Sequence, residues 1–277
     1  MSRWKNAAVL TVSAGTVLAM AACGSTTGPS DAPKQPTVLQ LLASDLKGSL
    51  QKTIDATDKA NSVTMTADGT MAGEKLKMQG VMDLGDPLKV EMTVSDPSEG
   101  PTTVRIIGTA IYIQVPEADR KEMGGKPWLK MDLGTIGAQA GMDFTKQFED
   151  IDPTKQVRTL LASEGVTVVG EETVNGAKTV HYTVTSPVGT YLGQVDATMR
   201  KQVEEQLTKN GVKEVKIDLW VDEQYQPRRV HMVMGTMSDL TVDYTDYGKP
   251  VTVAAPAAAE TTDFAEMLKG LKLPTGS

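Results

Sequence analysis

Polar and apolar residues alternate in short segments along most of the chain. Val63, Met65 and Ala67 alternate with threonine and aspartate, and the pattern resumes after each turn that contains Gly or Pro. This alternation predicts antiparallel strands with one buried and one polar face. The predicted strands cover residues 63–67, 76–84, 88–94, 104–107, 111–115, 128–131, 166–174, 177–186, 215–221, 230–234 and 240–244. Asn175-Gly176, between two of these strands, is a strong hairpin signal.

A helical period replaces the alternation in three segments. These are residues 38–60, a stretch that starts at Asp152-Pro153 and ends at Gly165, and residues 191–209. Asp as N-cap, Pro in the first turn and Gly at the end are typical helix boundaries. The apolar stripes are Leu42, Leu46, Leu50 and Ile54 in the first, Val157, Leu160 and Leu161 in the second, and Val195, Met199, Val203 and Leu207 in the third. Strands with helices on one side predict an α+β fold.

The N-terminus has the pattern of a secretory signal peptide. Arg3 and Lys5 precede an uncharged run of apolar and small residues that ends at Ala22, directly before Cys23. The run is shorter than the about 20 apolar residues of a transmembrane helix. Small residues before a cysteine resemble the lipobox of bacterial lipoproteins, with Met20 in place of the commoner leucine. The resemblance implies a diacylglyceryl or palmitate-type modification of Cys23 and cleavage before it.

This interpretation divides the chain into four parts. Residues 1–22 form the signal peptide, residues 23–36 a flexible tether rich in Gly, Ser, Thr and Pro, residues 37–254 the folded domain, and residues 255–277 a C-terminal tail. The tail contains a short apolar patch around Phe264 and Met267, which fits either a docking helix or a frayed end. The expected location is the outer face of the cytoplasmic membrane, in a bacterial cell envelope.

Composition excludes several classes of function. Removal of the signal peptide lowers the net charge from −7 to −9, because only Arg3 and Lys5 are lost. An acidic chain is a poor ligand for nucleic acid, so no nucleic-acid partner is expected. Cys23 is the only cysteine, which excludes a disulfide framework and a thiolate metal site. The 15 methionines suit either an ordinary core or an adaptable apolar cavity.

Three stretches together resemble one family. They are residues 170–182 with the Asn-Gly turn, residues 219–230 with Leu-Trp-Val-Asp and Pro-Arg-Arg-Val, and residues 244–251. With the lipobox, they resemble the actinobacterial lipoproteins of the LppX/LprAFG type over about residues 38–255. The resemblance implies a LolA-like half-barrel, a curved antiparallel sheet covered on its concave side by helices. It also implies a hydrophobic cavity that holds the acyl chains of a lipid or glycolipid, and an envelope transporter as a possible partner.

The expected cavity wall consists of apolar residues on alternating strand positions. They are Met65, Met78, Gly80, Met82, Val90, Met92, Ile106, Ile111, Ile113, Met232 and Met234. A half-open sheet under helices leaves a gap, whereas a small closed barrel fills with its own side chains. The opposing possibility is a sheet and helices that close on each other completely. The chain is therefore expected to bind an amphiphile and to carry or present it.

No catalytic constellation is found in the sequence. Two histidines, His181 and His231, are too few for a three-histidine zinc site, and no G-x-S-x-G, G-x-G-x-x-G or P-loop motif occurs. No enzyme activity, catalytic residue, metal or cofactor is therefore expected. The alternatives to a carrier are an interaction or regulatory lipoprotein that uses the same fold as a docking module, and an extracytoplasmic hydrolase.

Overall fold

The computed structural model describes residues 36–96, 100–135, 154–193, 195 and 197–270. The chain divides into two units, residues 1–35 and 36–277, and all described residues lie in the second. The predicted signal peptide, Cys23 and all of the tether before Pro36 lie outside the described residues. Among the residues that are described, no helix is both long and apolar enough to cross a membrane.

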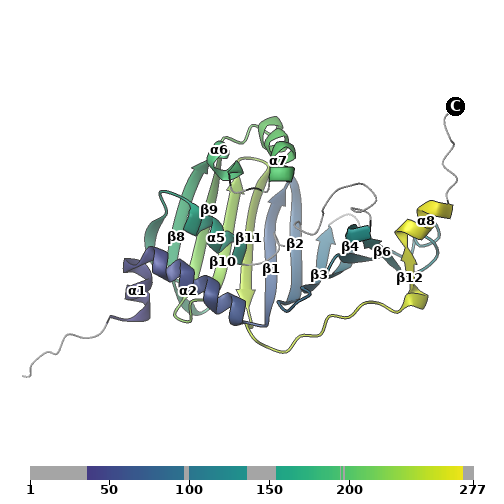
Figure 1. Cartoon of the computed structure of the whole chain (residues 1–277), viewed down its shortest axis with the longest axis horizontal. Coiled ribbons are helices and arrows are strands. Elements are labelled where there is room, and N and C mark those ends of the chain that lie inside the picture. The colour runs from purple at the N-terminus through teal and green to yellow at the C-terminus, as the bar shows by residue number, and fades with distance from the viewer. Residues whose placement is uncertain (1–35, 97–99, 136–153, 194, 196, 271–277) are drawn as a thin grey trace, which may run out of the picture. The chain divides into compact units, whose positions relative to one another are not determined.

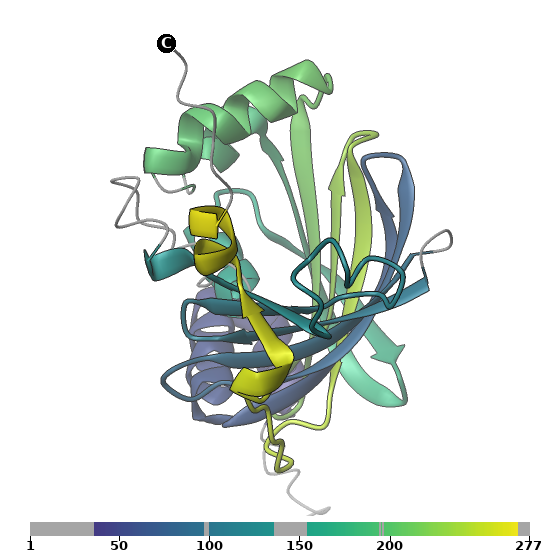
Figure 2. The ribbon, with the colours of Figure 1, turned by 90° about the vertical axis from the view of Figure 1, so that its right-hand side faces the viewer.

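Twelve strands form one curved, unclosed sheet (Figures 1 and 2). They are β1 (Ser62–Met71), β2 (Glu74–Asp83), β3 (Lys89–Asp96), β4 (Gly100–Ile107), β5 (Ala110–Gln114), β6 (Trp128–Asp132), β7 (Thr167–Val174), β8 (Ala177–Pro187), β9 (Glu214–Asp222), β10 (Pro227–Met234), β11 (Ser238–Thr245) and β12 (Thr261–Asp263). Their order is β12-β6-β5-β4-β3-β2-β1-β11-β10-β9-β8-β7, and only the β12–β6 pair is parallel. The predicted strands and the α+β half-barrel are confirmed.

The turn between β7 and β8 uses residues that tolerate left-handed backbone. In the β7–β8 hairpin, Asn175 and Gly176 have φ of 49° and 81°. Two successive positive φ values match a type I′ turn, whose twist fits the twist of the strands. The Asn-Gly hairpin predicted from the sequence is therefore present, and Val174 pairs directly with Ala177 across it.

The strand register separates the side chains into two faces. Met65 lies opposite Gly80 and Tyr244, and Gly80 lies opposite Met92. Directly opposed residues share a face, so these positions define one face that we call the inner face. The main core forms where the inner face meets the first helices. Its fully buried members include Leu42, Leu50, Val63, Val157, Leu160, Tyr182 and Leu219.

Two inner-face glycines let the sheet curl. A Cβ at Gly69 would lie 2.0 Å from the Asp239 backbone oxygen of β11, and one at Gly80 would lie 2.3 Å from the Glu91 backbone oxygen of β3. Only a residue without a side chain permits this approach, which is why glycine marks bends in strands. The missing side chain of Gly80 is thus taken up by the β3 backbone and does not widen the space for a ligand.

The first helical segment is two helices rather than one. α1 (Val38–Ser44) ends at Asp45, whose side chain accepts a hydrogen bond from the Gly48 amide and begins α2 (Leu46–Lys59). The periodicity of the leucines continues through this break, so the sequence predicted one continuous helix and was wrong there. Tyr182 of β8 ties α1 to the sheet, because its hydroxyl donates to the Leu42 carbonyl over 2.7 Å.

The later helices also differ from the predicted bounds. α5 covers Thr154–Ala162, and its predicted Asp152-Pro153 start lies outside the described residues. The segment predicted as a single helix from Tyr191 to Lys209 contains the end of α6 (Val188–Leu192) and then α7 (Ala197–Lys209). α7 crosses one end of the strands in Figures 1 and 2. It is fixed there by a small cluster whose buried members are Leu192, Leu207 and Val212.

Part of the segment predicted as a C-terminal tail belongs to the sheet. After a short 3-10 turn, η1 (Ala258–Glu260), β12 pairs with β6 in parallel, and α8 (Phe264–Gly270) follows. The apolar patch around Phe264 and Met267 is therefore helical. The sheet continues past the boundary expected at residue 254, because the chain returns after an extended connection to cover the edge of β6.

Candidate ligand-binding face

All of the residues predicted to line a cavity lie on the inner face. The register places Gly80, Met92, Val104 and Ile113 opposite one another in successive strands, and links Val90 to Ile106 and Ile111 in the same way. Met232 lies opposite Leu240 on the same face of β10 and β11. This common placement follows from the period of two in every strand.

Burial divides the predicted residues into two groups. Met65, Met82, Val90 and Ile106 have exposed fractions of 0–8% and belong to the main core. The side chains of the protein already cover them, so they do not border free space in this structure. The other predicted wall residues that have a side chain are partly exposed. They are Met78, Met92, Ile111, Ile113, Met232 and Met234.

An apolar cavity of about 470 Å³ opens on the inner face between β10, β11 and α7. Its size falls within the usual range of small-molecule sites. The lining residues are Met71, Ala72, Gln206, Asn210, Val230, Met232, Met234, Met237, Ser238, Leu240, Val242 and Tyr244. Met232 and Met234 were predicted. Met71, Leu240 and Val242 were missed as wall residues, although the same alternation that selected Met232 includes them.

The polar groups of this cavity are neutral. Gln206 reaches it from the C-terminal half of α7, Asn210 directly follows that helix, and Ser238 lies at the start of β11. No lining residue carries a carboxylate, ammonium or guanidinium group. An apolar wall with a few amides and hydroxyls can hold hydrocarbon and hydrogen-bond an uncharged polar group.

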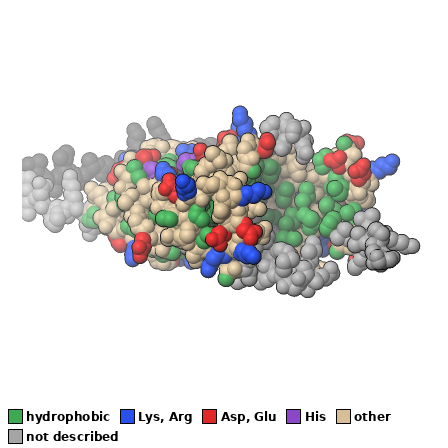
Figure 3. Space-filling view, turned by 90° about the horizontal axis from the view of Figure 1, so that it is seen from above, with side chains coloured by type: hydrophobic (Ala, Val, Ile, Leu, Met, Phe, Trp, Pro, Cys, Tyr) green, Lys and Arg blue, Asp and Glu red, His purple; other side chains and the backbone are tan. Residues whose placement is uncertain are grey.

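A larger apolar surface lies toward the far end of the sheet. Figure 3, seen from above, shows hydrophobic side chains gathered on the side where Figure 1 places β3 to β6. The partly exposed inner-face residues Met92, Val104 and Ile111 of these strands pack at the border of the main core. Large contiguous apolar surfaces on a folded protein usually mark binding sites.

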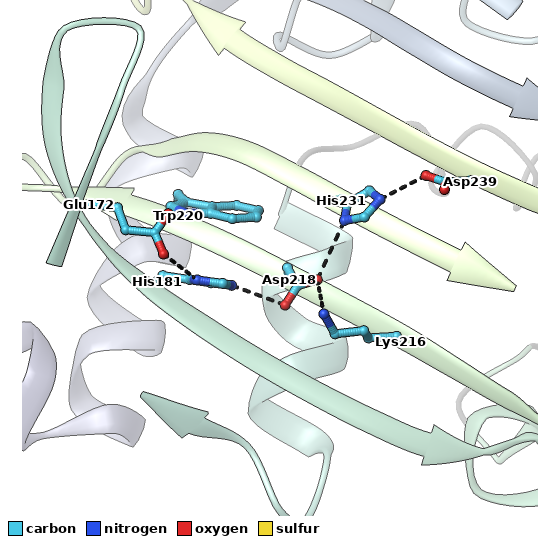
Figure 4. A network of polar contacts seen from close by, with 7 residues as sticks. All are labelled: Glu172, His181, Lys216, Asp218, Trp220, His231 and Asp239. Carbon is cyan, nitrogen blue, oxygen red and sulfur yellow. Dashed lines mark hydrogen bonds and ion pairs between the residues drawn. The ribbon is translucent and has the colours of Figure 1, made fainter. Parts of the chain in front are cut away.

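The opposite, outer face carries a network of paired polar side chains (Figure 4). The buried carboxylate of Asp218 contacts His181 Nε2 at 3.0 Å, Lys216 Nζ at 2.9 Å and His231 Nδ1 at 3.5 Å. Each imidazole also reaches a second carboxylate: His181 Nδ1 lies 2.9 Å from Glu172, and His231 Nε2 lies 2.8 Å from Asp239.

Trp220 completes the network through a stacking contact and a hydrogen bond. Its ring stacks on His181 with the centroids 4.1 Å apart, and its Nε1 donates to Glu172 over 2.8 Å. The hydrogen bonds from Trp220 and His181 lower the pKa of Glu172. Burial raises the pKa of Asp218, but hydrogen bonds that include those from Lys216 and His181 outweigh burial and lower it.

The outer network is built for structure rather than for a ligand. Every charged group in it has a protein partner. Among the described residues, no group of His, Cys, Asp or Glu side chains is arranged to hold a metal ion. The two histidines that the sequence analysis examined as metal ligands thus serve to pair carboxylates across β7 to β11.

The chain has relatives among known proteins. The family model of the LppX_LprAFG lipoproteins matches residues 146–253. An uncharacterised 31.2 kDa protein of Streptomyces griseus is 30% identical over 220 residues, which cover 76% of this chain and 66% of that relative. A candidate lipoprotein of Streptomyces coelicolor is 28% identical over 239 residues, which cover 79% of this chain and 75% of the relative.

The fold also has a solved counterpart. The crystal structure of the Mycobacterium tuberculosis lipoprotein LppX superimposes with a TM-score of 0.51 at 14% identity, covering 76% of this chain and 98% of LppX. At this identity the likeness concerns the fold alone. The family model, the Streptomyces relatives and the half-barrel agree with the resemblance seen in the sequence, and the chain belongs to the LppX/LprAFG family of lipoproteins.

Proposed function

We propose that this lipoprotein binds the hydrocarbon chains of a lipid or glycolipid on its inner face and carries or presents that lipid in the cell envelope, without catalysing a reaction. One observation carries the proposal: an uncharged apolar cavity of about 470 Å³ that opens beside a contiguous apolar surface. A surface of this kind is costly to leave in water, and it has the chemistry of an acyl chain.

The free energies favour such a role. Burial of one methylene group stabilises a complex by roughly 0.8 kcal/mol, so a chain of about sixteen carbons gains on the order of 12 kcal/mol before the costs of association. A lipid with such chains does not cross an aqueous space unaided. A passive carrier only needs to offer an apolar surface, and the neutral amides of Gln206 and Asn210 are available to the polar part of the ligand.

The proposed anchor defines where the carrier works. Acylation of Cys23 would hold it on the outer face of the cytoplasmic membrane, since two acyl chains anchor a protein stably. A flexible tether of ~14 residues reaches about 20 Å from the anchor. The domain would therefore stay beside a donor membrane and could receive lipid from an envelope transporter there.

Two neighbouring residues of β10 provide a matched test. Met232 lines the cavity, whereas Val233 points to the outer face, and both side chains are partly exposed. We expect Met232→Lys to abolish uptake of cis-parinaric acid, because an ammonium group in the cavity excludes hydrocarbon. We expect Val233→Lys to bind like the wild type. Fluorescence titration of the non-acylated proteins measures both, and circular dichroism shows that they are folded.

Native mass spectrometry of the purified non-acylated protein adds an independent measurement. A lipid that copurifies with the wild type, and is absent from folded Met232→Lys, supports the carrier. A wild-type protein that contains no lipid and takes up no cis-parinaric acid contradicts it and favours a docking module with the same fold. Equal uptake by the two lysine variants would show that this cavity is not the binding site.

A further inference from the structure

The chain segment after Val253 is held far less firmly than the sheet it covers. Val253 is buried, with an exposed fraction of 6%, and is the last buried residue before the described side chains end at Met267. Residues 254–260 are alanines, one proline and Glu260, and all of them except Pro256 are exposed. Residues 261–267 are partly exposed, apart from Glu266, which is exposed. Segments with few buried apolar contacts open locally at low free energy. We call residues 254–270 the strap.

Polar contacts from Arg105, Lys126 and Lys130 help to hold the strap, and Arg105 Nη1 donates to the Ala254 carbonyl over 3.2 Å. Lys126 Nζ donates to the carbonyls of Thr261 and Ala258 over 2.9 and 3.3 Å. The ammonium group of Lys130 lies 3.5 Å from the Asp263 carboxylate. β12 contributes only three residues to the sheet, and they pair in parallel, which is slightly weaker per residue than antiparallel pairing.

The hydroxyl group of Thr262 destabilises the docked state of the strap. The Thr262 hydroxyl is buried and finds no hydrogen-bond partner among the described residues. The same side chain packs against Gly124, where even a Cβ would lie 2.6 Å from Thr262 Cγ2. A buried hydroxyl without a partner disfavours the state that buries it. Release of the strap would return this hydroxyl to water.

The strap covers one end of the apolar inner face. Leu129 of β6 lies opposite Ile113 on that face, Thr262 pairs with Leu129, and α8 packs against β6. Figure 2, which looks at the sheet from this end, shows α8 on the side of the sheet that carries α7. The strap therefore lies where a hydrocarbon chain on β3 to β6 would leave the protein.

We propose that the strap is a releasable closure of the β6 end of the inner face, which opens by unpairing of β12 and so controls the entry of lipid. The gating role rests on the proposed lipid binding, but the release itself does not. Val253 remains in place as the fixed end, while β12 and α8 move together.

Hydrogen exchange of the lipid-free, non-acylated protein tests the release. Thr262→Val removes the unpaired hydroxyl and keeps the shape, so the amides of 128–132 and 261–267 should exchange about tenfold more slowly. Lys126→Met removes the two carbonyl contacts and should make the same amides exchange about tenfold faster. As controls, the same chemical changes are made at exposed positions in Thr70→Val and Lys121→Met, and their exchange rates should equal those of the wild type. The amides of β9 should exchange at the wild-type rate in every variant.

Entry of cis-parinaric acid, followed by stopped flow, tests the gating. Thr262→Val should slow entry and Lys126→Met should accelerate it, each in proportion to the change in exchange. If Thr262→Val and Lys126→Met exchange at the same rates as their controls, the proposed release of the strap is refuted. Altered exchange with unchanged entry would refute its role as a closure. If neither the wild type nor any variant takes up the probe, both the gating and the proposed function are refuted. This holds whatever the exchange data show.

Discussion

Gly80 shows how a single missing side chain determines the shape of the sheet. A Cβ at this position would lie 2.3 Å from the Glu91 oxygen and 2.9 Å from Met92 Cα, and both are backbone atoms that cannot turn aside. We therefore expect Gly80→Ala to force β2 and β3 apart and to lower the free energy of unfolding by about 1–3 kcal/mol. Urea denaturation measures the change.

A second glycine provides the control for this prediction. Gly189 lies in α6 without a positive φ, and a Cβ there would meet nothing within 4 Å. Gly189→Ala should leave the free energy of unfolding unchanged or raise it by about 0.5–1 kcal/mol, because alanine favours the helix. A Gly80→Ala variant as stable as Gly189→Ala would mean that the sheet does not need the close approach at β3.

The period of two along each strand predicts on which face of the sheet a residue lies, but it does not predict whether that residue is covered. It placed Met78 and Met92 on the face that borders open space, but it placed Met65 and Met82 there equally well, and those two are buried in the main core. Which part of a face is covered depends on helix packing, which no local pattern contains. The Asp218 network was not predictable for a similar reason, because its members come from separate strands and meet only through the register.

Asp45 separates α1 from α2, although the leucine period continues through it. Its side chain accepts the Gly48 amide at 3.0 Å and thereby begins α2 while α1 ends. We expect Asp45→Ala to lower the free energy of unfolding by about 1 kcal/mol, the usual effect of losing an N-cap. Asp55→Ala, an exposed change inside α2, should have a smaller effect in the same thermal or urea unfolding experiment. Equal effects would show that Asp45 does not act as a cap.

Elements with a clear period were predictable, whereas the breaks within the helices and the three-residue strand β12 were not. The strands and the Asn175-Gly176 hairpin follow from alternation and turn chemistry. The division between α1 and α2 was hidden because leucines recur every four residues on both sides of it. β12 has three residues with no apolar alternation, and it becomes a strand only because β6 offers an unpaired edge. Its existence is a property of the tertiary structure.

Across the whole molecule, stability should depend on pH in the acid range. The pKa values of Asp83, Glu172, Asp218 and Asp243 are lowered in the folded state, with hydrogen bonds as the dominant lowering cause in each. Groups with a lowered pKa stabilise the fold above their unfolded pKa of about 4, and this stabilisation is lost as the pH falls through the folded pKa. The urea midpoint should thus stay level near neutral pH and drop steeply below about pH 4.

Asp218 offers a way to attribute that drop to the outer network. Its side chain is 3% exposed and contacts the ammonium group of Lys216 and the imidazoles of His181 and His231, so Asp218→Asn should lower the free energy of unfolding at neutral pH by about 3 kcal/mol. The variant has one titrating carboxylate fewer, so its stability should fall less between pH 4 and pH 2.5 than that of the wild type. Asp68→Asn, whose side chain is 72% exposed in its pair with Lys77, should keep the wild-type profile. Parallel acid profiles for the wild type and Asp218→Asn would show that the lost stability has its origin elsewhere in the sheet.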